Sequence, residues 1–285
     1  MHSVEAMLAV ADAVPADQAA VWRQRALRAV KFVCDLAQKH NGRLPEHFKD
    51  DWTPDLDLNR DQPNDQFKPY GATPGHGLEW ARLILHLEAA LNNPSVEEDE
   101  VRLETTGSLV NTARKLFDTA VQDAWAVDGA DGFVYTTDWD GTPVVRQRMH
   151  WVLAEAIGAA AALYQRTGDQ KYADWYQTFW DYAARYVLDL KDGSWIHELN
   201  IHNMPAATTW PGKPDLYHAV QAVLLPRVPL APTLARALAD NLLDTKPSVE
   251  EPRSGVLKPR LAPAHEQHTP SVGANETTST TGGPR

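Results

Sequence analysis

The segment that decides the fold reads Thr73-Pro74-Gly75-His76-Gly77-Leu78-Glu79-Trp80-Ala81-Arg82. Thr73 can serve as an N-cap and Pro74 suits the first helical position, so the segment predicts a helix that begins here. His76 then lies in the first turn, with Glu79 three residues later on the same face. The residues that follow are apolar on nearly all sides of the helix, which is typical of a buried helix: Leu83, Ile84, Leu85, Leu87 and Leu91. A buried helix with such a polar first turn predicts a pocket at its N-terminal end.

The position of His76 also predicts its protonation state. The positive end of a helix dipole disfavours an imidazolium, so we expect His76 to be neutral and able to exchange protons near pH 7.

Apolar helices that begin with a histidine recur along the chain. Their heading residues are His2 with Glu5, His76 with Glu79, His150 and Trp151 with Glu155, and Tyr217 and His218 with Gln221. The near-even spacing of the four histidines predicts a repeated supersecondary unit.

Amphipathic helices are predicted between these buried ones, each followed by a glycine turn with a few extended residues. The helices cover residues 21–34, 113–121 and 172–186, and the turns cover residues 41–44, 131–135 and 192–196. Stacked in a ring, such units give an all-α toroid with short β-hairpins in its loops. The N-terminal end of every inner helix then points to the same mouth of the ring. The sequence divides into two parts. The predicted toroid, a partial barrel, spans residues 1–245.

Residues 246–285 are rich in Pro, Ser, Thr and Gly, which predicts a disordered polar tail.

The composition argues against several classes of protein, namely nucleic-acid-binding, membrane-spanning and disulfide-stabilised proteins. A net charge of −11 argues against nucleic acid and anionic membranes as partners. No apolar run is long enough to span a membrane, and the first residues lack the pattern of a signal peptide. Cys34 is the only cysteine, which excludes a disulfide framework. We therefore expect a cytoplasmic protein with a small-molecule ligand, and a possible homo-oligomer because an open toroid leaves apolar flanks uncovered.

The four histidines meet at one end of the predicted ring, with carboxylates one turn below. Neutral histidines in a concave, tryptophan-rich site are what proton abstraction next to a carbonyl requires. The carboxylates can orient the imidazoles or hold sugar hydroxyls, and a flat indole can cover the C–H side of a pyranose. The candidate catalytic residues are His76 and His218. The candidate substrate-binding residues are His2, Glu5, Glu79, Trp80, Trp151, Glu155 and Gln221.

Other interpretations of these side chains remain open. The spacing of His76 and Glu79 would permit a metal, but no second compact group of ligands is evident, so we expect neither a metal nor a cofactor. His2 can equally be part of a frayed helix end. His197, Glu198 and His202 can reach the mouth from a loop, although solvated loop residues are the favoured interpretation.

The segment from Lys68 to Leu83 resembles the signature of the N-acylglucosamine 2-epimerase superfamily, and its Glu79-Trp80 pair is most similar to the D-mannose isomerase and sulfoquinovose isomerase branch. Three further segments match the family in type and order: Met1-His2-x-x-Glu5-Ala6, Trp151-x-x-x-Glu155-Ala156 and Lys213-x-x-x-Tyr217-His218. The resemblance covers about residues 1–228.

This resemblance implies an (α/α)6 barrel, of which the chain holds about four of six helix hairpins and lacks N-terminal ones. It also implies metal-free proton transfer through a cis-enediol. His218 would move the proton between C2 and C1, His76 would be the partner acid/base, and His2 would help to bind the open-chain sugar.

The predicted function is interconversion of an aldose and its 2-ketose, of the D-mannose to D-fructose type. The alternatives are a sugar 2-epimerase, a glycoside hydrolase or lyase that recruits Glu79, Glu155 and Asp138, and a remnant that binds sugar without catalysis.

Overall fold

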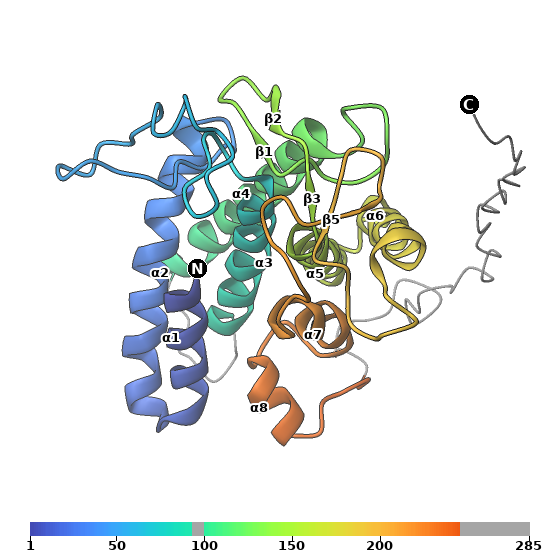
Figure 1. Cartoon of the computed structure of the whole chain (residues 1–285). Coiled ribbons are helices and arrows are strands. Elements are labelled where there is room, and N and C mark those ends of the chain that lie inside the picture. The colour runs from blue at the N-terminus through green and yellow to red at the C-terminus, as the bar shows by residue number, and fades with distance from the viewer. Residues whose placement is uncertain (93–99, 246–285) are drawn as a thin grey trace, which may run out of the picture.

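The computed structural model describes residues 1–92 and 100–245, and helices dominate it (Figure 1). The predicted tail, residues 246–285, lies outside the described residues. The helices are α1 (His2–Ala13), α2 (Ala16–Lys39), α3 (Pro74–Leu91), α4 (Glu100–Ala124), α5 (His150–Thr167), α6 (Gln170–Tyr182) with a π-helical turn (Ala183–Val187), α7 (Tyr217–Leu224) with a 3-10 turn (Leu225–Arg227), and α8 (Leu234–Ala239). Within the described ranges, none of these helices has the length and apolarity needed to cross a membrane.

α3 and α5 are buried on nearly all sides and lie between helices that bury only one face. α3 packs on α4 and α5, α1 packs on α2, and α5 packs on α6 and α7. Leu78 and Ile84 of α3 and Ile157 and Leu163 of α5 have no exposed surface. α2 and α6 each bury only one face, with buried residues at helical spacing. The prediction of buried helices is confirmed for α3 and α5. It is wrong for α1 and α7, which bury only one face, and α7 leaves Val220 and Val223 exposed.

The start of α3 is fixed largely by the backbone around it. Thr73 is the N-cap and Pro74 opens the helix as predicted, although the Thr73 side chain forms no capping hydrogen bond. Ala72 and Thr137 instead exchange two backbone hydrogen bonds of 2.9 and 3.0 Å. Gly71 precedes this bridge with a φ of +95°, and a Cβ there would lie 2.0 Å from the Thr137 carbonyl oxygen. The predicted helix therefore enters the core at a position set by a neighbouring loop.

Short antiparallel strands lie in the loops before the inner helices. β1 (Thr136–Thr137) pairs with β2 (Pro143–Val145), and β3 (Arg148–Met149), β4 (Glu198–Leu199) and β5 (Pro205–Ala206) form a three-stranded sheet. β3 runs directly into α5, so this sheet places the first residues of α5. The predicted glycine turn at residues 41–44 is present, with Gly42 at a φ of +87°, but no strand follows it. In the other two predicted turns only Phe133 and Trp195 form isolated β-bridges.

Gly75 lets α5 approach the first turn of α3. A Cβ at this position would lie 2.6 and 2.7 Å from two ring carbons of Trp151 and 2.8 Å from Val152. We expect Gly75→Ala to lower the free energy of unfolding by about 1–3 kcal/mol, the usual cost of overpacking, measured by urea denaturation.

Gly77→Ala is the matched control, two residues along the same turn. Its Cβ would meet only the Leu116 carbonyl oxygen, at 3.9 Å. Alanine should therefore leave stability unchanged or raise it by up to about 1 kcal/mol through helix propensity. An equal effect of both substitutions would contradict the packing argument.

Candidate active site

The N-terminal ends of the inner helices converge on Trp151, the second residue of α5. The ring of His76 lies 4.9 Å from the Trp151 ring between centroids, and the ring of His218 lies 5.7 Å from it. The structure thus brings the two predicted catalytic histidines against one predicted substrate-binding tryptophan.

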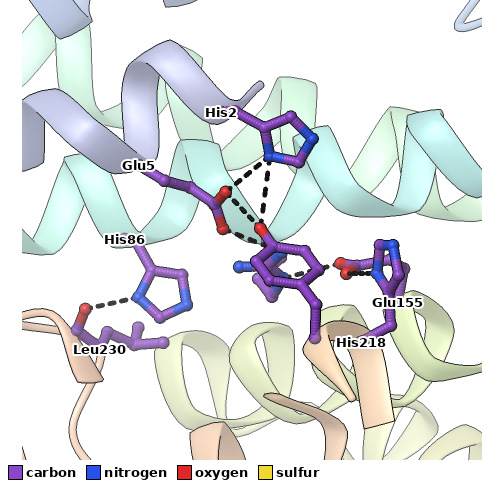
Figure 2. Close-up of polar contacts among 8 residues, drawn as sticks. His2, Glu5, His86, Glu155, His218 and Leu230 are labelled. Carbon is purple, nitrogen blue, oxygen red and sulfur yellow. Dashed lines mark hydrogen bonds and ion pairs between the residues drawn. The ribbon is translucent and has the colours of Figure 1, made fainter. Parts of the chain in front are cut away.

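His218 is held by Glu155, as Figure 2 shows. Nδ1 of His218 lies 2.9 Å from Oε1 of Glu155, and Oε2 of Glu155 accepts a 2.8 Å hydrogen bond from Nε of Arg82. Burial opposes ionisation of Glu155, but the Arg82 guanidinium and the contact with His218 together outweigh it, so the pKa of Glu155 is lowered. A carboxylate only accepts hydrogen bonds, so His218 donates through Nδ1 and its Nε2 carries the free lone pair.

His76 has a different partner from the one expected. Its Nδ1 lies 2.5 Å from Oε1 of Glu46, a residue of the loop after α2. Burial lowers the pKa of His76, but the Glu46 carboxylate more than offsets this, and the net pKa is raised. The expectation that its environment disfavours the imidazolium of His76 is therefore wrong, because a carboxylate in direct contact outweighs the end of a helix dipole. Glu46, and not Glu79, orients this histidine.

Replacing Glu46 should reverse this shift. We expect Glu46→Gln to lower the pKa of His76, because the amide keeps a hydrogen-bonding side chain and removes the negative charge. The measurement is an NMR titration of the His76 ring. Glu88→Gln, at the opposite end of α3, is the control and should leave the His76 titration unchanged. If Glu46→Gln also left it unchanged, Glu46 would not set the charge of His76.

Glu79 lies at the centre of the site and is 2% exposed. Its Oε1 forms no hydrogen bond with any residue that the structure describes. Burial and the nearby charge of Glu155 raise the pKa of Glu79. A raised pKa favours the neutral carboxyl group, which can donate a hydrogen bond to a ligand oxygen.

His2 and Glu5 of α1 close the site on the side of α7 (Figure 2). Nδ1 of His2 lies 3.1 Å from Oε2 of Glu5, and the Tyr217 hydroxyl donates to the same oxygen. The ring of His2 also meets the ring of Tyr217 edge-on at 5.6 Å. Tyr217 was not among the candidate site residues, although it heads the same helix directly before His218.

His2, Glu5 and Glu79 offer ligand atoms that all lie within 4.8 Å of one another. The expectation that no compact ligand group surrounds this part of α3 was therefore wrong, because α1 folds back onto it. Carboxylate and imidazole ligands suit a divalent cation. However, Oε1 of Glu5 lies 3.6 Å from Nη2 of Arg82, so the positive charge of an arginine already reaches this group.

The remaining predicted substrate-binding residues lie in two cavities. Trp80 lines a cavity of about 520 Å³ together with Glu46 and His76. Gln221 lines another, of about 550 Å³, together with Glu5 and Arg82. The structure thus does not bring Trp80 and Gln221 together.

The other histidines near the site have different surroundings. His150 is 4% exposed, and its ring nitrogens form no hydrogen bond with described residues. Burial and the neighbouring His197 and His218 lower the pKa of His150 to about 3, so it is neutral. His197 stacks on Trp210 at 6.0 Å, whereas His202 is exposed.

Glu198 is fully buried and accepts hydrogen bonds from the backbone N–H groups of Thr208, Thr209 and Trp210. The solvated interpretation therefore holds for His202 and is wrong for Glu198, which holds a loop in place.

Comparison with known proteins gives one consistent family. The chain matches the N-acylglucosamine 2-epimerase (GlcNAc 2-epimerase) family over residues 1–222. It is 53% identical to a D-mannose isomerase of Thermobifida fusca over 241 residues, and 51% identical to one of Pseudomonas cannabina pv. alisalensis over 240 residues. Each match covers 84% of this chain and 56% of the relative, so the chain spans about half the length of these relatives.

A crystal structure of a D-mannose isomerase superposes on this fold with a TM-score of 0.64 and 29% sequence identity, covering 77% of this chain and 52% of that one. The predicted α/α-barrel fold is confirmed. The chain belongs to the N-acylglucosamine 2-epimerase family.

Proposed function

We propose that this chain carries the acid/base residues of a metal-free sugar isomerase. The isomerase interconverts an aldose and its 2-ketose, of the D-mannose to D-fructose type. The observation that carries the proposal is the Glu155–His218 pair, which leaves the Nε2 lone pair of His218 free beside Trp151. The D-mannose isomerase relatives favour this substrate class.

The first half of the reaction forms an enediol. His218 removes the proton from C2 of the open-chain aldose, and the electron pair of that bond moves to form the C1–C2 double bond. The carbonyl oxygen on C1 then takes a proton from His76. The contact with Glu46 favours a protonated His76, which suits this role of acid.

The second half delivers the proton to C1. His76 takes back a proton from the hydroxyl on C2, and the protonated His218 gives its proton to C1, which leaves the 2-ketose. Trp151 covers the C–H face of the sugar, and Glu79 donates a hydrogen bond to an oxygen. His2 and Glu5 hold the hydroxyls at the other end of the open chain.

A sugar 2-epimerase is the second candidate. The observation that favours it is that two acid/base histidines contact the same tryptophan, since epimerisation needs proton transfer on both faces of C2. The chain should be incubated with D-mannose, D-glucose and N-acetylmannosamine, and the products separated by chromatography. D-Fructose from D-mannose is expected; a C2 epimer without ketose would overturn the isomerase proposal.

A further inference from the structure

Arg82 is a buried cation among three carboxylates of the proposed active site. It lies on α3 one turn below Glu79 and is 3% exposed. Its Nε donates to Glu155 of α5 at 2.8 Å, and its Nη2 lies 3.6 Å from Glu5 of α1. In residues 1–92 and 100–245, no other lysine or arginine forms an ion pair with these two carboxylates. Arg82 therefore joins three inner helices at the level of the site.

The two oxygens of Glu155 have separate partners. Oε2 accepts from Arg82, and Oε1 faces Nδ1 of His218. Both carboxylate oxygens of Glu155 are therefore held in place. Glu155 can keep the hydrogen of His218 on Nδ1 only while it remains a carboxylate. A protonated Glu155 could instead donate to Nδ1, and the ring hydrogen of His218 would then lie on Nε2.

We propose that Arg82 is a positioning residue that keeps Glu155 ionised and thereby keeps Nε2 of His218 available as the base. Arg82 acts through Glu155 and does not touch the substrate. The inference rests on the proposed function of His218, and it assigns a role to a residue outside the histidine pair.

Removing the charge of Arg82 should add one proton to the Glu155–His218 pair near neutral pH. A buried carboxylate without its cation either takes a proton or draws one onto its histidine partner. In both cases Nε2 of His218 loses its lone pair to a hydrogen, and catalysis returns only at higher pH. The titratable and charged groups next to the pair come from four helices. They are Glu5 of α1, Glu79, Arg82 and His86 of α3, His150 of α5, and Tyr217 of α7.

The test compares Arg82→Met, Arg82→Lys and a matched control, Arg166→Met. Arg166 also joins α5 to a buried glutamate of α3, Glu88, at 2.8 and 2.9 Å, but it does so at the opposite end of the two helices. Arg82→Met should lower kcat by roughly 10²-fold, leave KM within about threefold, and move the acidic limb of the pH profile upward. Arg82→Lys should recover most of kcat, and Arg166→Met should keep the parent profile.

A second readout does not require turnover. In ¹⁵N NMR, His218 should carry its hydrogen on Nδ1 in the parent, and on Nε2 or on both nitrogens in Arg82→Met at the same pH. An unchanged tautomer, or an equal loss of activity and thermal stability in Arg166→Met and Arg82→Met, would overturn the role of Arg82. Absence of any ketose from the parent chain would instead overturn the proposed function, which keeps the two failures distinguishable.

Discussion

His218→Ala is expected to abolish exchange of the substrate C2 proton with deuterated solvent. Glu155 holds Nδ1 of His218 at 2.9 Å, so the lone pair on Nε2 of the same ring is free to accept a proton. The other histidine against Trp151, His76, is biased toward its protonated form by Glu46 and is a poor base. The measurement is the decay of the C2 proton signal of D-mannose in deuterated water.

His202→Ala is the control for this experiment, since His202 is an exposed histidine on a loop. It should exchange the proton at the parent rate. Helix content by circular dichroism should not change in either variant, because His218 lies at the start of α7 and outside the packed interior. Exchange at the parent rate in His218→Ala would show that another group, such as His2 or a carboxylate, removes the C2 proton.

The parts of the fold that could be predicted from the sequence depend on neighbours in the chain. The start of α3 at Pro74 follows from the properties of proline, and the burial of α3 follows from its apolar surface. The start of α5 at His150 follows from the repeat of the same pattern. Periodicity therefore predicted the buried helices α3 and α5 and the residues at their N-terminal ends, whereas α1 and α7 are buried on one face only.

The partners of the two histidines could not be predicted in the same way. Glu46 lies 30 residues before His76 in an irregular loop, where no periodic pattern exists. Arg82 and Glu155 are 73 residues apart, and only the packing of α3 on α5 brings them together. The available signal was Arg82 within a helix that the sequence predicts to be buried, since a buried charge needs a partner. The contact with Glu46 also raises the pKa of His76, which the position of His76 at the start of a helix could not indicate.

His76→Ala is expected to reduce turnover by about 10²- to 10⁴-fold, the usual scale for loss of one general acid or base. Exchange of the C2 proton should fall less than ketose formation, because His218 and Glu155 remain in place while the sugar oxygens lose their proton donor. Both rates can be followed in one NMR experiment in deuterated water.

A double-mutant cycle with Glu46 separates this role from simple packing. Glu46 contacts Nδ1 of His76 at 2.5 Å, so it should act on the reaction through that ring. Glu46→Gln alone should reduce turnover, whereas adding it to His76→Ala should have little further effect. If the two losses simply multiplied, Glu46 would act independently of His76. If His76→Ala kept the parent turnover, another group, such as the carboxyl of Glu79 one turn along α3, would have to supply the proton to the sugar oxygen.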